Sequence, residues 1–509
     1  MLAGFHGRRV LGLIVLLAAT NWPAIYDSGP FYFPDTLTYI GTADAAVHHF
    51  TGWETAWTMK KLETSSVFTA PQRDEAHARS MRGPRDSSPV PKKEAGFLGR
   101  SVYYGLLLYF GAADHFFGLT IVLQGIAVLA SIWLVLRLQG MIVWPAIFLL
   151  GLLLCFFSDA AFFACFLMPD LFAGIAILVC AALFTAEREV RADEAAIAWS
   201  LLSASLLFHD SVPAVVVALS VSYFAWKILR RSQLNLWQDR VKYGVLFAAL
   251  ITSAVGRSAY VTLIKHSVGD APLRIPFLSA HLIEGPGTTF LHATCPGNGF
   301  VLCEFIDRFP ESSGTFLWGV GGGSSVSWKY MSPALERRVN LEDLGFAGAV
   351  FRNAPLEFLE FMGKDILRQI KNFSLAEFLY PPNLKREFDE KLPPRNRAEV
   401  DRSRAYVGDL PIRAFSTLNY AFVAAALVFL AQRRLFRGGG SPGDEGKWKL
   451  TAWVITGAVI NATVCGAVSG PFSRYQARVV WLLPLAALLF VVDGLVKRTE
   501  TVVADRQLG

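Results

Sequence analysis

Acidic side chains stand next to long apolar runs at several points of the sequence, where a carboxylate can act as a general base. The first is Asp35, in the aromatic stretch 31–39 that follows an apolar run from about residue 10 to residue 25. A general base takes the proton from an attacking hydroxyl group. Asp is also common at helix starts, where its side chain caps backbone N–H groups. This stretch by itself leaves open whether Asp35 is a base or a cap.

Asp159 and Asp170 form a second acidic pair, in a short connection between two apolar runs. Asp170 immediately precedes the second of these runs, so it either caps that helix or faces the same pocket as Asp35. In the latter case it would orient an acceptor or a cation. His209 and Asp210 also stand at the end of an apolar run, and a polar end of a membrane span is enough to explain them.

Arginine offers the complementary chemistry near the end of the chain. Arg474 and Arg478, with Tyr475 between them, lie in the connection before the last apolar run. The planar guanidinium group donates two hydrogen bonds at once, a geometry that fits phosphate oxygens. The alternatives are arginines that extend from a span end to the membrane surface, and a tyrosine that anchors the span at the interface.

Common metal and cofactor motifs are absent from the sequence. It has no His-x-x-x-His or Cys-x-x-Cys spacing. The glycine run 319–323 lacks the lysine of a phosphate loop, and we expect it to be a flexible connection. The sequence therefore predicts no cofactor and leaves the use of a divalent metal open.

The composition is that of a membrane protein. Of the 509 residues, 53% are hydrophobic and 17% are charged, below the roughly 25% charged residues of soluble domains. Lys and Arg lie mostly between apolar runs rather than on one basic face, so the net charge of +7 does not indicate nucleic-acid binding. These cations are better explained as signals that orient membrane spans.

The apolar runs predict an all-helical protein with ten membrane spans. No small-residue cleavage site ends the first run, so we expect an uncleaved span there. Lys or Arg flanks every second connection, which predicts that both termini lie in the cytoplasm and that the other connections lie outside. The spans are expected at about residues 10–25, 116–136, 141–157, 171–186, 195–208, 212–228, 243–264, 415–431, 450–468 and 479–496.

Two large outer segments separate the spans into modules. Their middle parts differ: residues 59–95 are rich in charged and small residues and are expected to be mobile. Pro355, by contrast, begins an amphipathic helix that reaches Phe373 and could lie on the membrane or on the span ends. The predicted parts are an N-terminal membrane module 1–264 with a first outer loop 27–100, an outer segment 265–411 and a C-terminal membrane module 412–509.

The cysteines fall into two groups. Cys295 and Cys303 are eight residues apart in a polar segment rich in Pro and Gly. A disulfide is expected if this segment lies outside, and two free thiols are the alternative. The other four cysteines lie in or beside apolar runs and are expected to be small buried hydrophobic residues.

Four short stretches together resemble the GT-C superfamily, multispanning glycosyltransferases that use polyprenyl-phosphate sugars. This superfamily includes the protein mannosyltransferase and aminoarabinose transferase groups. The stretches are Asp35 after the first span, Gly99-Arg100-Ser101-Val102-Tyr103-Tyr104, Pro169-Asp170 before the fourth span, and Ser473-Arg474-Tyr475 before the last.

The resemblance implies that Asp35 is the catalytic base, because an acid in the first outer loop usually has that role in the superfamily. A second acid often follows the first, but here Thr36 follows. This departure leaves the subgroup and the use of a metal undetermined. We expect the other site residues to bind substrate: Asp159, Asp170, Arg100, Tyr103, Arg474, Tyr475 and Arg478.

The sequence thus predicts an inverting glycosyltransferase of the inner (plasma) membrane that acts at the outer face. Its donor would be a polyprenyl-phosphate sugar in the membrane lipid, and its acceptor a hydroxyl group of a glycan, lipid or protein. The alternatives are a transporter or flippase of lipid-linked saccharides and a noncatalytic assembly protein for envelope polysaccharide. A cavity lined by Asp35 and Arg474 would favour the enzyme, and a pore through the middle would favour transport.

Overall fold

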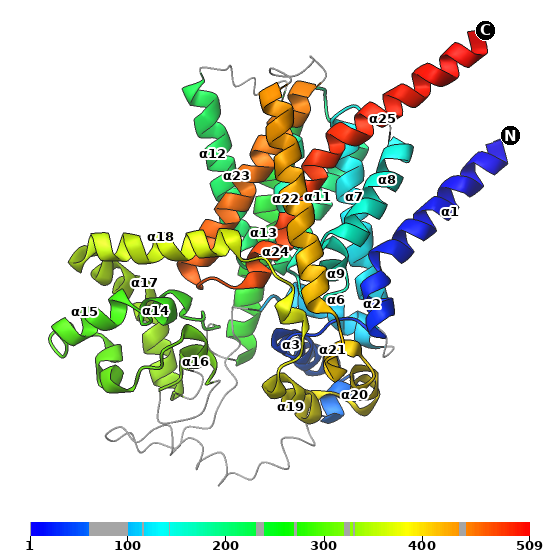
Figure 1. Cartoon of the computed structure of the whole chain (residues 1–509). Helices are drawn as coiled ribbons and strands as arrows, with labels where there is room; N and C mark the ends of the chain where they lie inside the picture. Colours follow the sequence, from blue (N-terminus) through cyan, green and yellow to red (C-terminus); the bar gives the residue numbers. More distant parts are fainter. Residues whose placement is uncertain are drawn as a thin grey trace.

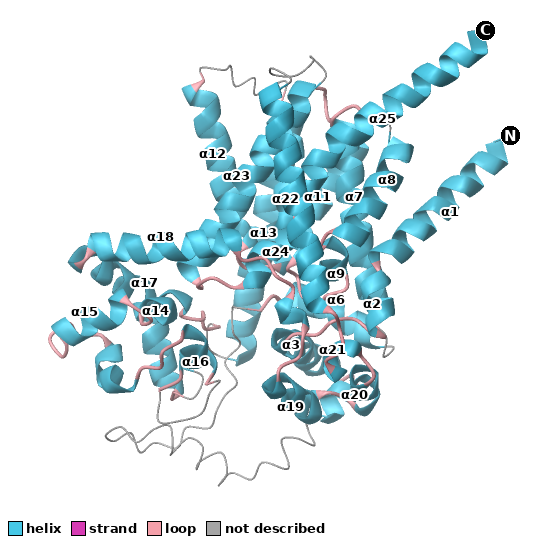
Figure 2. Cartoon of the chain, in the orientation of Figure 1, coloured by secondary structure: helices cyan, strands magenta, loops and turns pink. Residues whose placement is uncertain are grey.

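The structure is a computed structural model that describes residues 2–60, 100–113, 117–141, 143–230, 239–268, 272–319, 326–328, 331–436 and 444–508. Most of the stretch 59–95, predicted to be mobile, and most of the glycine run 319–323 lie outside these ranges. Within them the chain is helical, with no strand and a single isolated bridge between Phe31 and Phe166 (Figure 2). The all-helical prediction is therefore confirmed for the described chain.

The N-terminal half supplies most of the bundle. Its helices are α1 (Leu2–Thr20), α2 (Trp22–Asp27), α3 (Pro34–Thr51), α6 (Val102–Ala113), α7 (Gly118–Leu138), α8 (Val143–Phe157), α9 (Ala160–Ala164), α10 (Leu171–Thr185), α11 (Ala192–Phe208), α12 (Val212–Leu229) and α13 (Arg240–Val268). The last part of the chain adds α22 (Ile412–Phe436), α23 (Glu445–Val468), α24 (Ser473–Val480) and α25 (Leu482–Leu508).

Six helical stretches are long and apolar enough to cross a membrane, judged by length and composition. They are Gly118–Leu138, Val212–Leu229, Arg240–His266, Ile412–Leu435, Glu445–Val468 and Ser473–Val496. A helical membrane protein is thus supported, but the predicted count of ten is not confirmed. The predicted first, third and fourth spans match shorter apolar helices, Arg9–Thr20, Val143–Phe157 and Leu171–Thr185, and the fifth matches α11.

The short helix α10 lies at the centre of the bundle. Every residue of α10 except Phe184 is buried, and α7, α11, α12, α23 and α24 all pack against it. A helix that is apolar on all sides belongs inside a protein or a membrane bundle. Gly174 permits a close contact with α24, because a Cβ atom there would lie 2.8 Å from the Arg478 carbonyl oxygen.

The segment between α13 and α22 contributes to two hydrophobic cores. Residues from Ile275 to Met362 build a core of their own, formed by α14 (Phe277–Leu282), α15 (Pro286–Thr294), η1 (Val301–Arg308), α16 (Ser313–Trp318), α17 (Pro333–Asn353) and α18 (Pro355–Lys371). Residues after Leu375 join the core of the bundle instead, through η3 (Ala376–Phe378), α19 (Pro382–Lys391), α20 (Pro394–Asp401) and α21 (Arg404–Val407).

These two parts lie at the same end of the bundle. Figure 1 shows α14–α16 and α19–α21 at the end opposite to both chain termini, with α18 lying crosswise to α22 and α23. Termini on one side of the bundle agree with the predicted topology. Their assignment to the cytoplasm stays a prediction.

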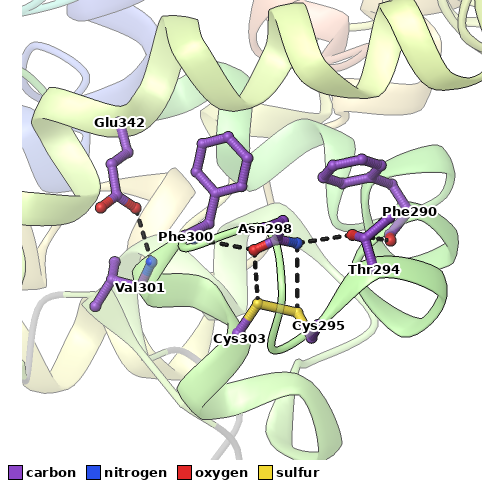
Figure 3. The surroundings of a disulfide bond; sticks show 8 residues. All are labelled: Phe290, Thr294, Cys295, Asn298, Phe300, Val301, Cys303 and Glu342. Atoms are coloured by element: carbon purple, nitrogen blue, oxygen red, sulfur yellow. Dashed lines mark hydrogen bonds between the residues drawn. A yellow bond between two sulfur atoms is a disulfide. The ribbon is translucent and has the colours of Figure 1, made fainter.

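A disulfide closes the loop between α15 and η1. Cys295 and Cys303 are joined, and Asn298 sits inside the loop they close (Figure 3). The Asn298 amide nitrogen donates to Thr294 Oγ1 (2.7 Å), and its oxygen accepts from the Phe300 backbone N–H (2.9 Å). The structure thus contains the predicted pair, while Cys155, Cys165, Cys180 and Cys465 are buried free thiols.

Candidate functional site

Backbone pairing brings the first acidic stretch next to the second. The Phe31 N–H donates to the Cys165 carbonyl (3.0 Å), and the Leu167 N–H donates to the Phe31 carbonyl (2.9 Å). Thr36 Oγ1 adds a bond to the Leu167 carbonyl (2.9 Å). Since these bonds join the chain just before α3 to the chain just before α10, the starts of the two helices lie together.

Asp35 lies in the first turn of α3 but does not cap it. The N-cap position belongs to Phe33, and the Asp35 carboxylate instead accepts a hydrogen bond from Arg100. Both side chains are mostly buried, with 19% and 13% of their surface exposed. Gly105 lets α6 approach α3, because a Cβ atom at this residue would lie 2.7 Å from the Tyr39 carbonyl oxygen.

The Asp35–Arg100 pair lies next to an aromatic side chain that packs on the core of residues 275–362. The Arg100 guanidinium carbon is 5.6 Å from the Trp318 ring centroid, at the end of α16. Cations near an indole ring are attracted to its face. The site therefore receives a side chain from the 275–362 core that no sequence signal indicated.

Asp170 is a completely buried acid that lies within 4 Å of three basic side chains. Its Oδ1 atom accepts from Arg478 Nη1 (3.2 Å), with Arg474 Nε at 3.7 Å and His209 Nε2 at 3.8 Å. Its side chain makes no capping bond, so the capping interpretation is wrong in this structure. Burial acts to raise the pKa of Asp170, but Arg474, His209 and Arg478 hold that pKa below its usual range.

Arg478 holds this acid from inside the bundle. Its side chain has no exposed surface, and it also donates to Ser211 Oγ (2.9 Å) and Asn461 Oδ1 (3.0 Å). His209 accepts from Arg478 Nη1 at 2.7 Å. A buried, well-bonded guanidinium does not extend to the membrane surface, so the alternative of a surface-reaching side chain is wrong for Arg478 in this structure.

Arg474 has unused hydrogen-bonding capacity. Its guanidinium carbon lies 4.0 Å from the Phe33 ring centroid, and only 9% of the side chain is exposed. Its Nε and Nη1 atoms are buried and have no hydrogen-bond partner. Buried donors normally have acceptors, so this side chain is suited to bind an anion. The negative charge of Asp35, two residues after Phe33, interacts with the positive charge of Arg474.

Glu377 of η3 completes the cluster on the other side of Arg474. Its Oε1 accepts from the Arg474 backbone N–H (3.2 Å), and its Oε2 lies 3.5 Å from Arg474 Nε. Burial raises the pKa of Glu377 although Arg474 lowers it. Glu377 was not among the predicted site residues, because it reaches the site only through packing of η3 on the bundle.

Phe378, the residue after Glu377, explains that packing. Its ring lies 5.0 Å from Phe31, 5.5 Å from Phe162 and 4.7 Å from Phe166, measured between centroids. The aromatic residues that flank Asp35 and precede Asp170 therefore also fix η3. The sequence signal for this contact is Glu377-Phe378, an acidic residue followed by an aromatic one in the outer segment.

The structure brings together most of the predicted site residues. Tyr475 lies beside the two arginines, with its ring centroid 5.3 Å from Arg474 and 5.2 Å from Arg478. Asp159 lies elsewhere and accepts from Asn419 of α22 (3.1 Å). Tyr103 also points away, because its hydroxyl donates to the Gly256 carbonyl of α13 (2.7 Å). His209 belongs to the cluster, a role that the interpretation as a polar span end does not include.

The charges of the cluster nearly balance. Three carboxylates (Asp35, Asp170 and Glu377) face three guanidinium groups (Arg100, Arg474 and Arg478). Among the described residues, no group of three or more His, Cys, Asp or Glu side chains could hold a metal ion. Protonation of Glu377 would leave the cluster with one excess positive charge, which suits a singly charged anion.

A shallow, open groove of about 660 Å³ lies on the surface of α13, and only residues of that helix line it. It is lined by Ala254, Val255, Ser258, Ala259, Thr262, Leu263 and His266. It is not the predicted cavity, because neither Asp35 nor Arg474 lines it. The same helix reaches the cluster through Arg257, which donates to Asp210 (2.7 Å), the neighbour of His209.

Comparisons with protein-family models, with curated proteins and with solved structures found no match to this chain. A functional assignment therefore depends on the geometry of the cluster around Asp35, Asp170 and Arg474.

Proposed function

We propose that the protein is a membrane glycosyltransferase of the GT-C type, which moves a sugar from a polyprenyl phosphate to an acceptor hydroxyl group. The observation that carries this proposal is Arg474, a buried guanidinium whose Nη1 atom has no hydrogen-bond partner, stacked on the residue two before Asp35. A carboxylate base and a free anion-binding donor in one place are what the reaction needs.

Asp35 takes the proton of the acceptor hydroxyl in this proposal. The acceptor oxygen forms a bond to the anomeric carbon, and the bond from that carbon to the phosphate oxygen breaks. The bonding electrons leave with the phosphate, so the products are the glycosylated acceptor and polyprenyl phosphate. Attack from the face opposite the phosphate inverts the anomeric configuration.

The arginines stabilise the leaving phosphate. The donor is a phosphodiester with one negative charge, and the released monoester gains charge as the bond breaks. Positioned donors that meet developing charge in a water-poor site lower the barrier strongly. Arg474 offers for this purpose its Nη1 group, which has no hydrogen-bond partner, and the positive charge of Arg100 adds to the same field.

The remaining members of the cluster have positioning roles. Arg478 and Asp170 are both fully buried, so they hold α24 and α10 in register rather than contact a sugar. Glu377 fixes the first turn of α24 through the Arg474 backbone. For the isoprenoid tail of the donor we propose the groove along α13, whose lining combines apolar and small polar side chains.

A donor panel tests the proposal. Purified protein in detergent is given polyprenyl-phosphate sugars that differ in the sugar, with a mixture of glycan, lipid and peptide acceptors. The expected result is release of polyprenyl phosphate with one of the donors, and a product whose anomeric configuration is opposite to that of the donor by NMR. The same protein is also reconstituted in vesicles. If it moves the intact donor across the membrane without consuming it, this result supports the transporter alternative instead.

A further inference from the structure

The helix α18 presents three different faces. Its first face is buried against the protein and includes Met362, Asp365 and Gln369. Gln369 is bonded in both directions to Phe472: its amide nitrogen donates to the carbonyl (2.8 Å), and its oxygen accepts from the N–H (3.0 Å). This face therefore fixes α18 on the chain that leads into α24.

Contacts at the end of α23 fix the level at which α18 crosses the bundle. A Cβ atom at Gly466 would lie 3.1 Å from both the Asp365 carbonyl oxygen and the Ile366 Cα atom. Gly466 is two residues before the end of α23, a candidate membrane span. Figure 1 shows α18 lying crosswise to α23. The helix thus lies at the level where a span leaves the hydrocarbon.

The second face of α18 is apolar and open. Leu356, Leu359 and Leu367 are 82%, 56% and 59% exposed. Their spacings of three and eight residues place them on one side of a helix, since each residue advances the helix by about 100°. Exposed leucines at this density are unusual in water and indicate contact with an apolar phase.

The third face is charged and lies beside the second. Five charged residues recur at spacings of three and four, which places them on one stripe. Lys364 pairs with Glu360 within this stripe (2.6 Å), and the Lys364, Glu360 and Arg368 side chains are 63%, 65% and 70% exposed. The stripe consists of Glu357, Glu360, Lys364, Arg368 and Lys371.

We infer that α18 is an interfacial helix, with its leucine stripe in the boundary between headgroups and acyl chains and its charged stripe in water. Helices with adjoining apolar and charged stripes are typical of such positions. The helix packs on α23, a candidate span, and α23 itself exposes the apolar side chains Ile455, Val459 and Val468. Packing of α18 on the end of a candidate span whose own surface is apolar selects lipid as the partner.

The position of α18 has a consequence for the site. Phe472, which Gln369 holds, is two residues before Arg474. The depth of α18 therefore sets the depth of the Arg474 guanidinium relative to the lipid headgroups. The inference about α18 itself does not depend on the proposed transfer reaction, and it is tested without an activity assay.

Single spin labels on neighbouring residues test this inference. The native cysteines are buried or disulfide-bonded, so an introduced cysteine is the reactive one. The variants are the pairs Leu359→Cys with Glu360→Cys, and Leu367→Cys with Arg368→Cys. Each is labelled, reconstituted in phosphatidylcholine vesicles, and measured for collision with oxygen, which enters lipid, and with a water-soluble nickel chelate.

The expected result is a contrast within each pair. Labels on Leu359 and Leu367 collide more with oxygen and less with nickel than labels on Glu360 and Arg368. Equal exposure to nickel at both members of a pair would overturn the inference. So would leucine labels shielded from both reagents, because that result indicates a protein partner, such as a second copy of the chain, on the apolar face.

Discussion

At the scale of single residues, Arg474 combines deep burial with unsatisfied donors. Arg478, by contrast, donates hydrogen bonds through both of its terminal nitrogen atoms, Nη1 and Nη2. Lysine keeps the positive charge of arginine but lacks its planar set of N–H donors. A change of Arg474 to lysine should therefore separate the contribution of hydrogen bonds from that of charge alone.

We predict that Arg474→Lys weakens donor binding about 10- to 100-fold, since hydrogen bonds to charged groups contribute about 1.5–3 kcal/mol each. The dissociation constant of a fluorescent polyprenyl phosphate measures this effect. Arg413→Lys is the matched control, because Arg413 is exposed at the start of α22. An unchanged dissociation constant for Arg474→Lys would show that Arg474 does not contact the phosphate.

Asp27 supports a second prediction at this scale, about pH. Its carboxylate accepts from the Ala405 backbone N–H (2.8 Å) and so links α2 to α21. Burial raises the pKa of Asp27 from 3.8 to about 7. The folded protein therefore holds a proton that the unfolded chain releases at lower pH. The stability from this group is complete below pH 4 and is lost as the pH rises through 7.

Asp27→Asn removes the titration and keeps an acceptor for Ala405. We predict that the variant gains thermal stability relative to the wild type between pH 5 and pH 8, by on the order of 1–4 kcal/mol in total. Thermal unfolding in detergent at several pH values measures the difference. A difference that stays constant across this range would refute the raised pKa.

The residues of the site were predictable to different degrees. Asp35, Asp170 and Arg474 stand at the ends of apolar runs, where the sequence marks them as unusual polar residues. Glu377 is one acid among many in a polar segment, and only the packing of Phe378 brings it to Arg474. Local sequence cannot show which of several acids a tertiary contact selects.

At the scale of helices, close contacts through glycine bring the site together. Gly174 allows α24 to approach α10, so that Arg478 reaches Asp170. A methyl group there would meet the Arg478 carbonyl and the Trp481 indole nitrogen, both at 2.8 Å. Backbone atoms and a buried ring cannot move away cheaply.

We predict that Gly174→Ala destabilises the protein by about 1–3 kcal/mol, the usual cost of overpacking a core. The control is Gly244→Ala on α13, where a Cβ atom would meet nothing within 4 Å. That variant should be neutral or gain about 0.5–1 kcal/mol from its better helix propensity. Thermal unfolding of both variants decides the matter, and equal stabilities would mean that the α10–α24 contact is looser than described.

Helix types were predicted more reliably than membrane spans. Long runs such as those of α7, α23 and α25 are apolar over enough residues to identify a span from composition alone. The α10 run is equally apolar, but at 15 residues it is shorter than the roughly 20 that cross a bilayer. Hydropathy cannot distinguish a short span from the buried centre of a bundle.

At the scale of the whole molecule, residues from opposite ends of the chain meet. The start of α3 and the start of α24 are more than 400 positions apart in the sequence, yet Phe33 and Arg474 are stacked. The sequence predicted this meeting through family resemblance, because no local pattern connects such distant positions. The division of residues 272–411 between a core of their own and the core of the bundle was not predicted, since both stretches are polar and rich in Pro.

The most direct test of the account is the rate of sugar transfer by Asp35→Asn, with a donor that the wild type uses. We predict a loss of about 10²- to 10⁴-fold in that rate, the usual effect of removing a general base, with unchanged donor affinity. Asp210→Asn is the control, because Asp210 also pairs with an arginine, Arg257, but is 36% exposed. Its variant should transfer normally. Near-wild-type transfer by Asp35→Asn would contradict the proposed role of Asp35.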